Sequence, residues 1–327
     1  MFFLSITIVS SFITISANSW LGMWMGLEIN LLSIIPLMNN MNPLSTEASL
    51  KYFITQAMAS TLILLSIISI SMKMEFFYNH FNHLIFNSAL ITKMGMAPFH
   101  FWFPEIIDGL TWMMTTLMLT WQKIAPMILL MYNLNYSNFF FLIIIIAMLI
   151  SGINGLNQIS LRKILVFSSI NHMAWMISSL LINKFIWLIY FLIYALMTIF
   201  LTMNFHINNI FFFNQMISLM NKNIIFKFFF IFNFLSLGGI PPFIGFFPKW
   251  LIIHNLINMK FYNLALLMIL LTLFTLFFYT RLMFSSLLLN FSQSNFFLNK
   301  TTNLLMISMN FMFLNSLIFS TFCINLL

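Results

Sequence analysis

The sequence predicts an all-α polytopic membrane protein with about eleven transmembrane helices, and three observations support this prediction. First, 62% of the 327 residues are hydrophobic and only 6% are charged, whereas about a quarter of the residues in a soluble domain are charged. Second, the apolar residues form long runs rather than the short alternating strands of a membrane β-barrel. Third, the loops between the runs are short, so we expect a single membrane domain over residues 1–327. This composition excludes an ordinary soluble enzyme, a disordered chain and a nucleic-acid-binding protein.

The predicted spans follow from the points where polar residues and Pro/Gly clusters interrupt the apolar runs. A helix needs about 20 apolar residues to cross a hydrocarbon core of roughly 30 Å. The spans are residues 2–16, 22–38, 50–71, 84–103, 109–132, 138–157, 160–182, 185–205, 223–257, 262–285 and 303–323. The first is apolar from its start and lacks arginine, so we interpret it as a membrane helix rather than a targeting signal.

The ninth span is too long for one crossing, because residues 223–257 would extend about 52 Å as a single helix. It contains three glycines and three prolines: Gly238, Gly239, Pro241, Pro242, Gly245 and Pro248. We therefore expect a discontinuous helix, which is tolerated at membrane depth where protein or a water-filled cavity satisfies the backbone.

A motif in the fourth span recurs in the ninth. Residues 95–104 and 239–248 both read G-x-x-P-F-x-x-x-F-P. The ninth span comes five positions after the fourth, an odd number, so the two copies cross the membrane in opposite directions. This pattern predicts two inverted five-helix repeats, residues 1–132 and 138–285, each with a discontinuous helix, followed by a C-terminal helix. The alternative is a chance recurrence in a chain with 43 phenylalanines.

The basic residues of the loops predict the orientation. Most lie on the side of the N-terminus: Lys51, Arg162, Lys163, Lys222, Lys227, Arg281 and Lys300. Fewer lie on the other side: Lys73, Lys184 and Lys260. By the positive-inside rule, the N-terminus faces the matrix or the cytoplasm.

Four charged residues fall inside or beside the spans. Glu28 lies in the second span, Lys93 shortly before Gly95, Lys123 in the fifth span, and Lys249 directly after the second break. If all four faced lipid, they would cost about 10–14 kcal/mol. We therefore expect them to face the protein interior, near water or one another. Ion pairs that only hold helices together are the alternative explanation.

These residues favour proton transfer over cation binding. Burial favours the neutral form of a lysine and a nearby carboxylate favours the charged form, so such a group can take up and release protons. A cation site needs several oxygen ligands, and three lysines accompany one glutamate here. His172 lies in the seventh span, and histidine is a residue type suited to proton relay, although a hydrogen-bonded core histidine is equally consistent. We interpret Glu105 and Asp108 as a solvated turn, and Cys323, the single cysteine, excludes a disulfide or cysteine-based metal site within the chain.

Three segments together carry a family resemblance: residues 91–105, 120–126 and 238–250. They resemble the chain 2 family of mitochondrial NADH:ubiquinone oxidoreductase (respiratory complex I), and the length and codon bias are insect-like. Members of this family are similar to antiporter subunits built from two inverted five-helix repeats. The resemblance covers nearly the whole chain, and it agrees with eleven spans because animal members lack three N-terminal helices.

The resemblance implies a proton-translocating subunit of the membrane arm. Glu28 would match the glutamate that pairs with the lysine of the first broken helix, Lys93. Lys123 and His172 would match the connecting residues, and Lys249 the lysine from which protons leave.

The resemblance also implies a location and partners. The chain would be a multi-pass protein of the mitochondrial inner membrane, with its N-terminus in the matrix and its C-terminus in the intermembrane space. Its partners would be other membrane-arm subunits, including neighbouring antiporter-like subunits, and membrane lipids, but no nucleic acid. It would hold no cofactor or metal, since FMN, iron–sulfur clusters and ubiquinone belong to other subunits. An Mrp-type cation/proton antiporter subunit and a structural assembly subunit remain alternatives.

Overall fold

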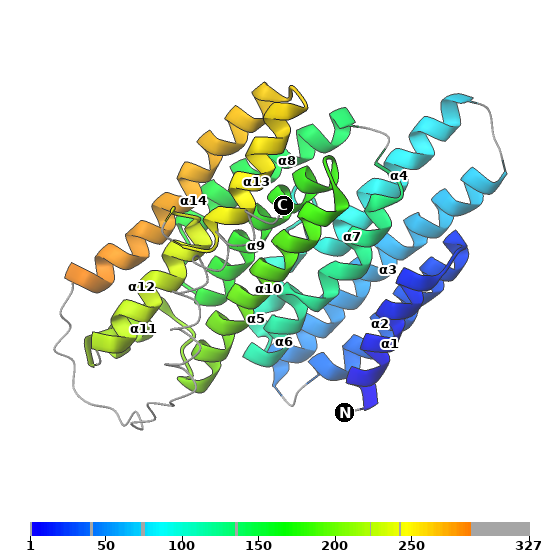
Figure 1. Ribbon diagram of the computed structural model, residues 1–327. Coiled ribbons are helices and arrows are strands. Elements are labelled where there is room, and N and C mark those ends of the chain that lie inside the picture. Colours follow the sequence, from blue (N-terminus) through cyan, green and yellow to red (C-terminus); the bar gives the residue numbers. More distant parts are fainter. Residues whose placement is uncertain are drawn as a thin grey trace. The chain divides into compact units, whose positions relative to one another are not determined.

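In a computed structural model of the chain, the described residues are 2–39, 42–72, 76–134, 137–222, 224–241 and 243–288 (Figure 1). Within these ranges every regular element is a helix, apart from an isolated antiparallel β-bridge between Ser160 and Phe212. The chain forms two compact units, Met1–Ile146 and Ala147–Leu327. The predicted helix 303–323, Lys300 and Cys323 lie outside the described residues.

The helices of the first unit are α1 (Phe2–Ser16), α2 (Trp20–Met38), α3 (Pro43–Ser71), α4 (Phe76–Met94), α5 (Trp102–Gly109), α6 (Trp112–Leu119), the 3₁₀ turn η1 (Trp121–Lys123) and α7 (Ile124–Met131). Helix α8 (Ser137–Leu156) leads into the second unit. The second unit continues with α9 (Leu161–Leu180), α10 (Lys184–Ile207), α11 (Phe213–Lys222), α12 (Ile224–Gly238), α13 (Phe246–Asn258) and α14 (Tyr262–Leu288).

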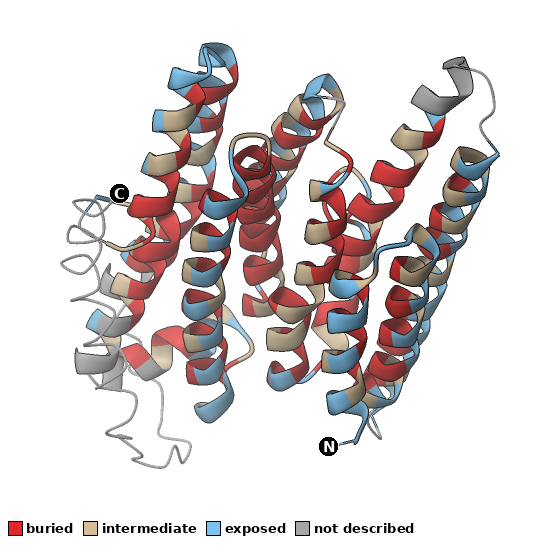
Figure 2. Cartoon of the chain, turned by 45° about the vertical axis from the view of Figure 1, so that its right-hand side comes forward, coloured by how far each residue is buried: buried red, intermediate tan, exposed pale blue. Residues whose placement is uncertain are grey.

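Many large apolar side chains are exposed and several lysines are buried, which is unusual for a soluble protein. Figure 2 shows the exposed and buried positions. Leu32 and Leu142 are 61% and 62% exposed, whereas Lys123 is 1% exposed. Six helical segments of the described chain are long and apolar enough to cross a membrane: α2, α3, Trp112–Met131, α8, α10 and Tyr262–Phe284. The chain is therefore an all-helical polytopic membrane protein.

Helices α1 and α2 pack closely because both present small side chains at their contact (Figure 1). The buried residues of α1 are all small and polar: Thr7, Ser10, Ser11 and Thr14. A Cβ atom on Gly26 of α2 would lie 2.5 Å from Thr14 Cγ2 and 2.9 Å from its backbone nitrogen. Small residues let membrane helices approach closely, since lipid tails are as apolar as leucine and burial alone does not drive association.

Both predicted helix breaks are present, and both begin in the same way. Helix α4 ends at Met94 and α12 ends at Gly238, each followed by a glycine with positive φ: Gly95 at 69° and Gly239 at 78°. The two backbone hydrogen bonds at each end, such as Gly95 N–H to Thr92 and Met96 N–H to Ile91, form a Schellman motif. The chain resumes as helix at α5 and α13.

A further interruption was not predicted. The range 109–132 was expected to be one continuous helix with Lys123 in its middle, but it divides into α6, η1 and α7. Pro126 follows Lys123 by three residues and cannot donate a hydrogen bond to the Gln122 carbonyl, so regular α-helix is unfavourable here. Lys123 therefore lies in a 3₁₀ turn rather than in a regular helix.

Other elements also differ from prediction, and helix α4 begins at Phe76 rather than residue 84. Helix α3 begins at Pro43 rather than residue 50, because proline is well suited to the first helical turn and polar residues extend the helix past its apolar run. Helix α11 occupies a region expected to be a loop. It has only ten residues, and its buried Met216, Ile217 and Met220 occupy one helical face, so its amphipathic pattern is too short to resemble a membrane span.

Candidate functional site

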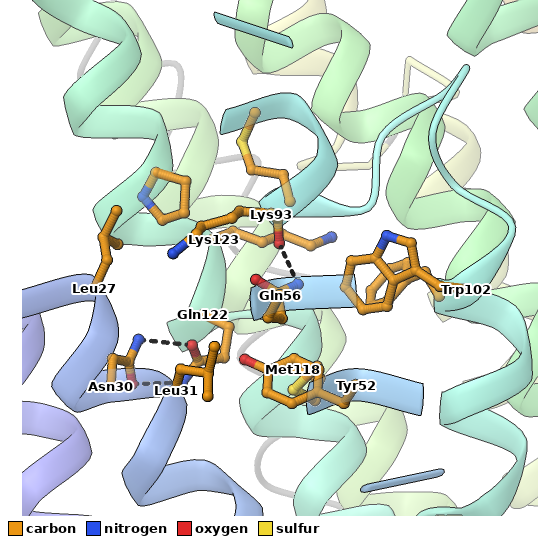
Figure 3. Close-up of a pocket in the computed structure, with 13 residues that line it drawn as sticks. Leu27, Asn30, Leu31, Tyr52, Gln56, Lys93, Trp102, Met118, Gln122 and Lys123 are labelled. Atoms are coloured by element: carbon orange, nitrogen blue, oxygen red, sulfur yellow. Dashed lines mark hydrogen bonds between the residues drawn. The ribbon is translucent and has the colours of Figure 1, made fainter. Parts of the chain in front are cut away.

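Lys93 and Lys123 enter the same pocket in the first unit (Figure 3). Lys93 lies in the last turn of α4, directly before the break, and Lys123 ends η1. Their exposed fractions are 8% and 1%. The pocket has room for about one water molecule. It is lined by Leu27, Asn30, Leu31, Tyr52, Gln56, Lys93, Met94, Trp102, Phe103, Met118, Gln122, Lys123 and Pro126.

Amide side chains give this pocket its polar lining (Figure 3). Asn30 Nδ2 donates to Gln122 Oε1 at 2.8 Å, and Gln122 Nε2 donates back to Asn30 Oδ1 at 3.3 Å. Gln56 Nε2 donates to the backbone carbonyl of Lys93 at 3.3 Å. These bonds tie α2 to η1 and α3 to the end of α4. Polar groups that converge on a cavity are what buried water requires, so the pocket is suited to hold water between the two ammonium groups.

Glu28 lies on α2, two residues before Asn30, and is partly buried. It is close enough to act electrostatically on Lys93. The two side chains form no direct ion pair; the ion pairs within the described part of the chain join Lys51 to Glu47 and Glu105. Glu28 therefore lies near Lys93 without contacting it.

The second unit is built around α9, in which every residue from Ile164 to Leu180 is buried. The buried set includes Ser168, Ser169, Asn171 and His172. His172 Nδ1 and the Tyr190 hydroxyl form a hydrogen bond of 2.9 Å, in which the donor depends on the histidine tautomer. A helix buried on all sides that carries this many polar residues indicates a polar interior rather than a lipid-facing helix.

Lys249 lies at the second break and is 6% exposed. Its Nζ donates to the Gly238 carbonyl at 2.8 Å and lies 5.9 Å from the centre of the Trp175 ring. Its stem passes over Gly239, where a Cβ atom would lie 2.8–3.1 Å from the end of the lysine. Trp175 is on α9, one turn after His172, so Lys249 lies against the helix that carries His172.

The structure thus buries all four basic residues that were predicted to lie in the interior. Lys93 and Lys123 lie in the first unit, and His172 and Lys249 lie in the second. The sequence prediction missed the amides Asn30, Gln56 and Gln122, although an isolated amide in an apolar run already indicates a position that faces the protein interior. No group of three or more His, Cys, Asp or Glu side chains that could hold a metal occurs among the residues described.

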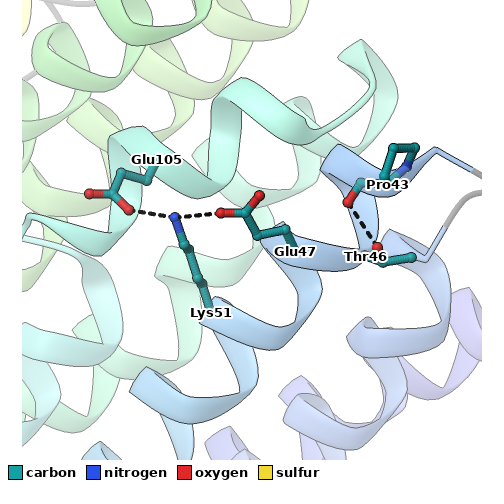
Figure 4. Close-up of polar contacts among 5 residues, drawn as sticks. All are labelled: Pro43, Thr46, Glu47, Lys51 and Glu105. Carbon is teal, nitrogen blue, oxygen red and sulfur yellow. Dashed lines mark hydrogen bonds and ion pairs between the residues drawn. The ribbon is translucent and has the colours of Figure 1, made fainter.

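A separate ionic cluster lies on the surface of the first unit (Figure 4). Lys51 of α3 forms ion pairs with Glu47 at 3.0 Å and with Glu105 of α5 at 2.8 Å. All three side chains are well exposed. Glu105 is exposed as expected, but Glu105 and Asp108 lie in helix α5 rather than in a turn, so that part of the interpretation is wrong. The cluster is distinct from the buried lysines.

The sequence profile described as "NADH:quinone oxidoreductase/Mrp antiporter, TM" matches residues 17–275. The NADH-ubiquinone oxidoreductase chain 2 of Anopheles gambiae is 47% identical over 316 residues, covering 95% of this chain and 92% of that protein. The chain 2 protein of Mus musculus is 42% identical over 291 residues, covering 86% and 84%.

Solved structures show the same fold at low identity. A chain of respiratory complex I from Thermus thermophilus aligns with a TM-score of 0.85 at 20% identity, covering 95% of this chain and 76% of that one. A chain of the Mrp complex from Dietzia sp. aligns with a TM-score of 0.77 at 15% identity, covering 90% and 61%.

Proposed function

The chain belongs to the NADH:quinone oxidoreductase/Mrp antiporter membrane family, which confirms the resemblance seen in its motifs, and we propose that it is a proton-translocating core subunit of the membrane arm of respiratory complex I. It is in this sense a subunit of an enzyme, NADH:ubiquinone reductase, and does no redox chemistry itself. The chain 2 name of its relatives at 40–47% identity supports this function.

The observation that carries the proposal is the pair of buried lysines in one polar pocket. Lys93 and Lys123 are both removed from lipid, and Asn30, Gln56 and Gln122 line the space between them. Two ammonium groups in one site repel each other, so gain of a proton by one favours its loss from the other. Such a site passes protons on rather than storing them.

The proposed mechanism couples this pocket to a reaction elsewhere in the complex. NADH oxidation and ubiquinone reduction change the electrostatics along the arm, and Glu28 approaches Lys93 or withdraws from it. A proton then passes by water through Lys123 and His172 to Lys249 and leaves. Moving one charge against 100 mV requires about 2.3 kcal/mol, which the electron-transfer reaction supplies.

The finer architecture belongs to the same proposal. Eleven spans form two inverted five-helix repeats, 1–132 and 138–285, and a helix at 303–323. The chain lies in the mitochondrial inner membrane with its N-terminus in the matrix and its C-terminus in the intermembrane space. FMN, iron–sulfur clusters and ubiquinone bind to other subunits, and the chain contacts lipids and neighbouring antiporter-like subunits. The two similar breaks at Gly95 and Gly239 support the repeats.

An Mrp-type antiporter subunit is the second candidate, because an Mrp complex shares the fold. Relatives at 40–47% identity that carry the chain 2 name favour complex I. The two candidates differ in what drives transport: the complex I subunit moves protons only while NADH is oxidised, whereas an antiporter exchanges Na⁺ for protons in liposomes without an electron donor.

The test is Lys123→Met in the assembled complex, with Lys184→Met, at the exposed start of α10, as the matched control. We expect Lys123→Met to abolish or sharply reduce turnover that is coupled to proton movement in sealed inner-membrane vesicles, and Lys184→Met to leave it unchanged. Unchanged turnover and unchanged protons per NADH in Lys123→Met would refute the assignment of the proton path and leave a structural role for the chain.

A further inference from the structure

The interior of the second unit holds three tyrosines that the proton path above does not use. Tyr190 and Tyr194 lie on α10 and Tyr279 on α14, and none is more than 1% exposed. The chain contains 43 phenylalanines and 8 tyrosines. Phenylalanine would fill the same space without burying a hydroxyl, which is costly unless the hydroxyl is used. The hydroxyls therefore call for an explanation other than packing.

Buried tyrosines occur beside the predicted proton-carrying groups in both units. In the part of the chain that the structure describes, the buried tyrosines are Tyr52, in the pocket of Lys93 and Lys123, and the three of the second unit. Tyr132 and Tyr262, by contrast, are 52% and 57% exposed. Burial of a tyrosine thus coincides with proximity to a buried lysine or histidine.

One end of the tyrosine group contacts His172. The Tyr190 hydroxyl forms the 2.9 Å hydrogen bond to His172 Nδ1. Tyr194 lies one turn further along α10, with its ring centre 5.1 Å from that of His172. The histidine is therefore held against two phenolic side chains of α10.

The other end of the group reaches the Lys249 site. A Cβ atom on Gly238 would lie 3.6 Å from Tyr279 Cδ2, so the tyrosine ring lies against this glycine. The carbonyl of the same glycine accepts the hydrogen bond from Lys249 Nζ. Tyr279 and Lys249 thus both lie next to Gly238, at the end of α12.

The space between the two ends is polar. Tyr279 lies within electrostatic range of both Tyr190 and Tyr194. Its hydroxyl is buried without a hydrogen-bond partner among the described residues, and the buried Ser168 and Ser169 lie on the adjacent helix α9. Asn171 Nδ2 donates to Thr275 Oγ1 on α14 at 3.1 Å.

Two buried polar atoms of α9 indicate a place for internal water. Asn171 Oδ1 and Trp175 Nε1 are buried without a hydrogen-bond partner among the described residues. One is an acceptor and the other a donor. Buried polar atoms of this kind are usually satisfied by internal water, so water is expected to complete the polar connection between α9 and α14.

We propose that Tyr190, Tyr194 and Tyr279, with internal water, form a hydroxyl relay that carries protons between His172 and Lys249. Each hydroxyl accepts a proton on its oxygen while releasing its own, so every tyrosine is neutral before and after the step. His172 gives up one proton and the Lys249 amine gains it. The relay rests on the proposed function and adds the residues that perform the transfer within the second unit.

The test is Tyr279→Phe in the assembled complex, which removes one hydroxyl and keeps the ring. Tyr262→Phe makes the same change at an exposed position of the same helix and is the control. We expect Tyr279→Phe to lower turnover coupled to proton movement at least about tenfold, since a positioned proton-transfer group contributes a factor of 10² or more. The control keeps the parent rate, and both variants assemble in normal amounts.

Further variants distinguish a proton relay from a role of the tyrosines in packing alone. Tyr190→Phe should lower the rate to a similar extent, and the double variant should be no slower than the slower single one, because groups that act in series are not additive. Parent rates in both single variants would overturn the relay, as would two independent losses that multiply. If Tyr279→Phe assembles poorly, Tyr190→Phe carries the test.

Lys249→Met distinguishes failure of the relay from failure of the proposed function. Loss of proton movement in Lys249→Met together with parent behaviour in both tyrosine variants refutes the relay alone. Parent behaviour in Lys249→Met and Lys123→Met refutes the proposed function, and the relay with it.

Discussion

Replacing Gly239 with alanine tests whether the second helix break positions Lys249. Gly239 has a φ of 78°, and its missing side chain leaves the space through which the lysine passes. An alanine Cβ would lie 2.8 Å from Lys249 Nζ and 2.9 Å from Cδ. The flexible lysine is the part that can move, so we expect it to be displaced from the Gly238 carbonyl.

The expected cost has two parts. A residue with a Cβ in the left-handed region costs roughly 1–2 kcal/mol. Loss of the hydrogen bond between Lys249 Nζ and the Gly238 carbonyl costs about 1.5–3 kcal/mol, because the donor is charged. The sum, about 2.5–5 kcal/mol, is large for a single methyl group.

The neighbouring glycine supplies the control. Gly238 lacks a positive φ, and a Cβ there would meet only Tyr279 Cδ2, at an ordinary contact distance of 3.6 Å. Gly238→Ala should therefore cost less than about 1 kcal/mol. The assays are the midpoint of heat inactivation of the assembled complex and the number of protons moved per NADH. Equal effects of the two substitutions, or parent behaviour of Gly239→Ala in both assays, would refute this reasoning.

Three other substitutions test the packing and the polar groups of the first unit. Asn30→Leu should lower stability by about 1–3 kcal/mol, because the Gln122 amide is left without its hydrogen-bond partner. The double variant Asn30→Leu, Gln122→Leu should lose less stability than the sum of the two single variants. Additive shifts in the midpoint of heat inactivation would contradict the pairing. Gly26→Ala should push α1 away from α2, because the new Cβ contacts Thr14, and should lower stability by about 1–3 kcal/mol. A normal amount of assembled complex on a native gel would contradict this prediction. Lys51→Met should change stability little and leave coupled turnover unchanged, since its ion pairs are exposed to solvent. A loss of turnover as large as that of Lys123→Met would place Lys51 on the proton path.

The features that sequence predicted well depend on local rules or on large energies. The breaks at Gly95 and Gly239 follow from the backbone preferences of glycine and proline, which act within a few residues. The burial of Lys93, Lys123 and Lys249 follows from the cost of exposing a charge to lipid, which exceeds any local preference.

The features that sequence missed depend on what each side chain meets in the folded chain. An uncharged amide such as Gln56 is cheap enough to face either lipid headgroups or the interior, and only packing against α4 identifies it as part of the pocket. The tyrosines of α10 and α14 do not stand out in the sequence, because they lie in runs of aromatic and aliphatic residues. The relay proposed for them depends on the packing of both helices against α9. The 3₁₀ turn at Lys123 could have been predicted, because Pro126 indicates an interrupted helix one turn before it.

The Lys249 side chain also has a mechanical role in the broken helix. It is attached to α13, and its Nζ binds the last carbonyl of α12, so it spans the seven residues that separate the two half-helices. A charged donor makes a hydrogen bond about twice as strong as a neutral one. Departure of the proton therefore loosens the joint between α12 and α13, and its return tightens the joint. In the proposed path, the proton that Lys249 carries therefore also sets how firmly α12 and α13 are joined.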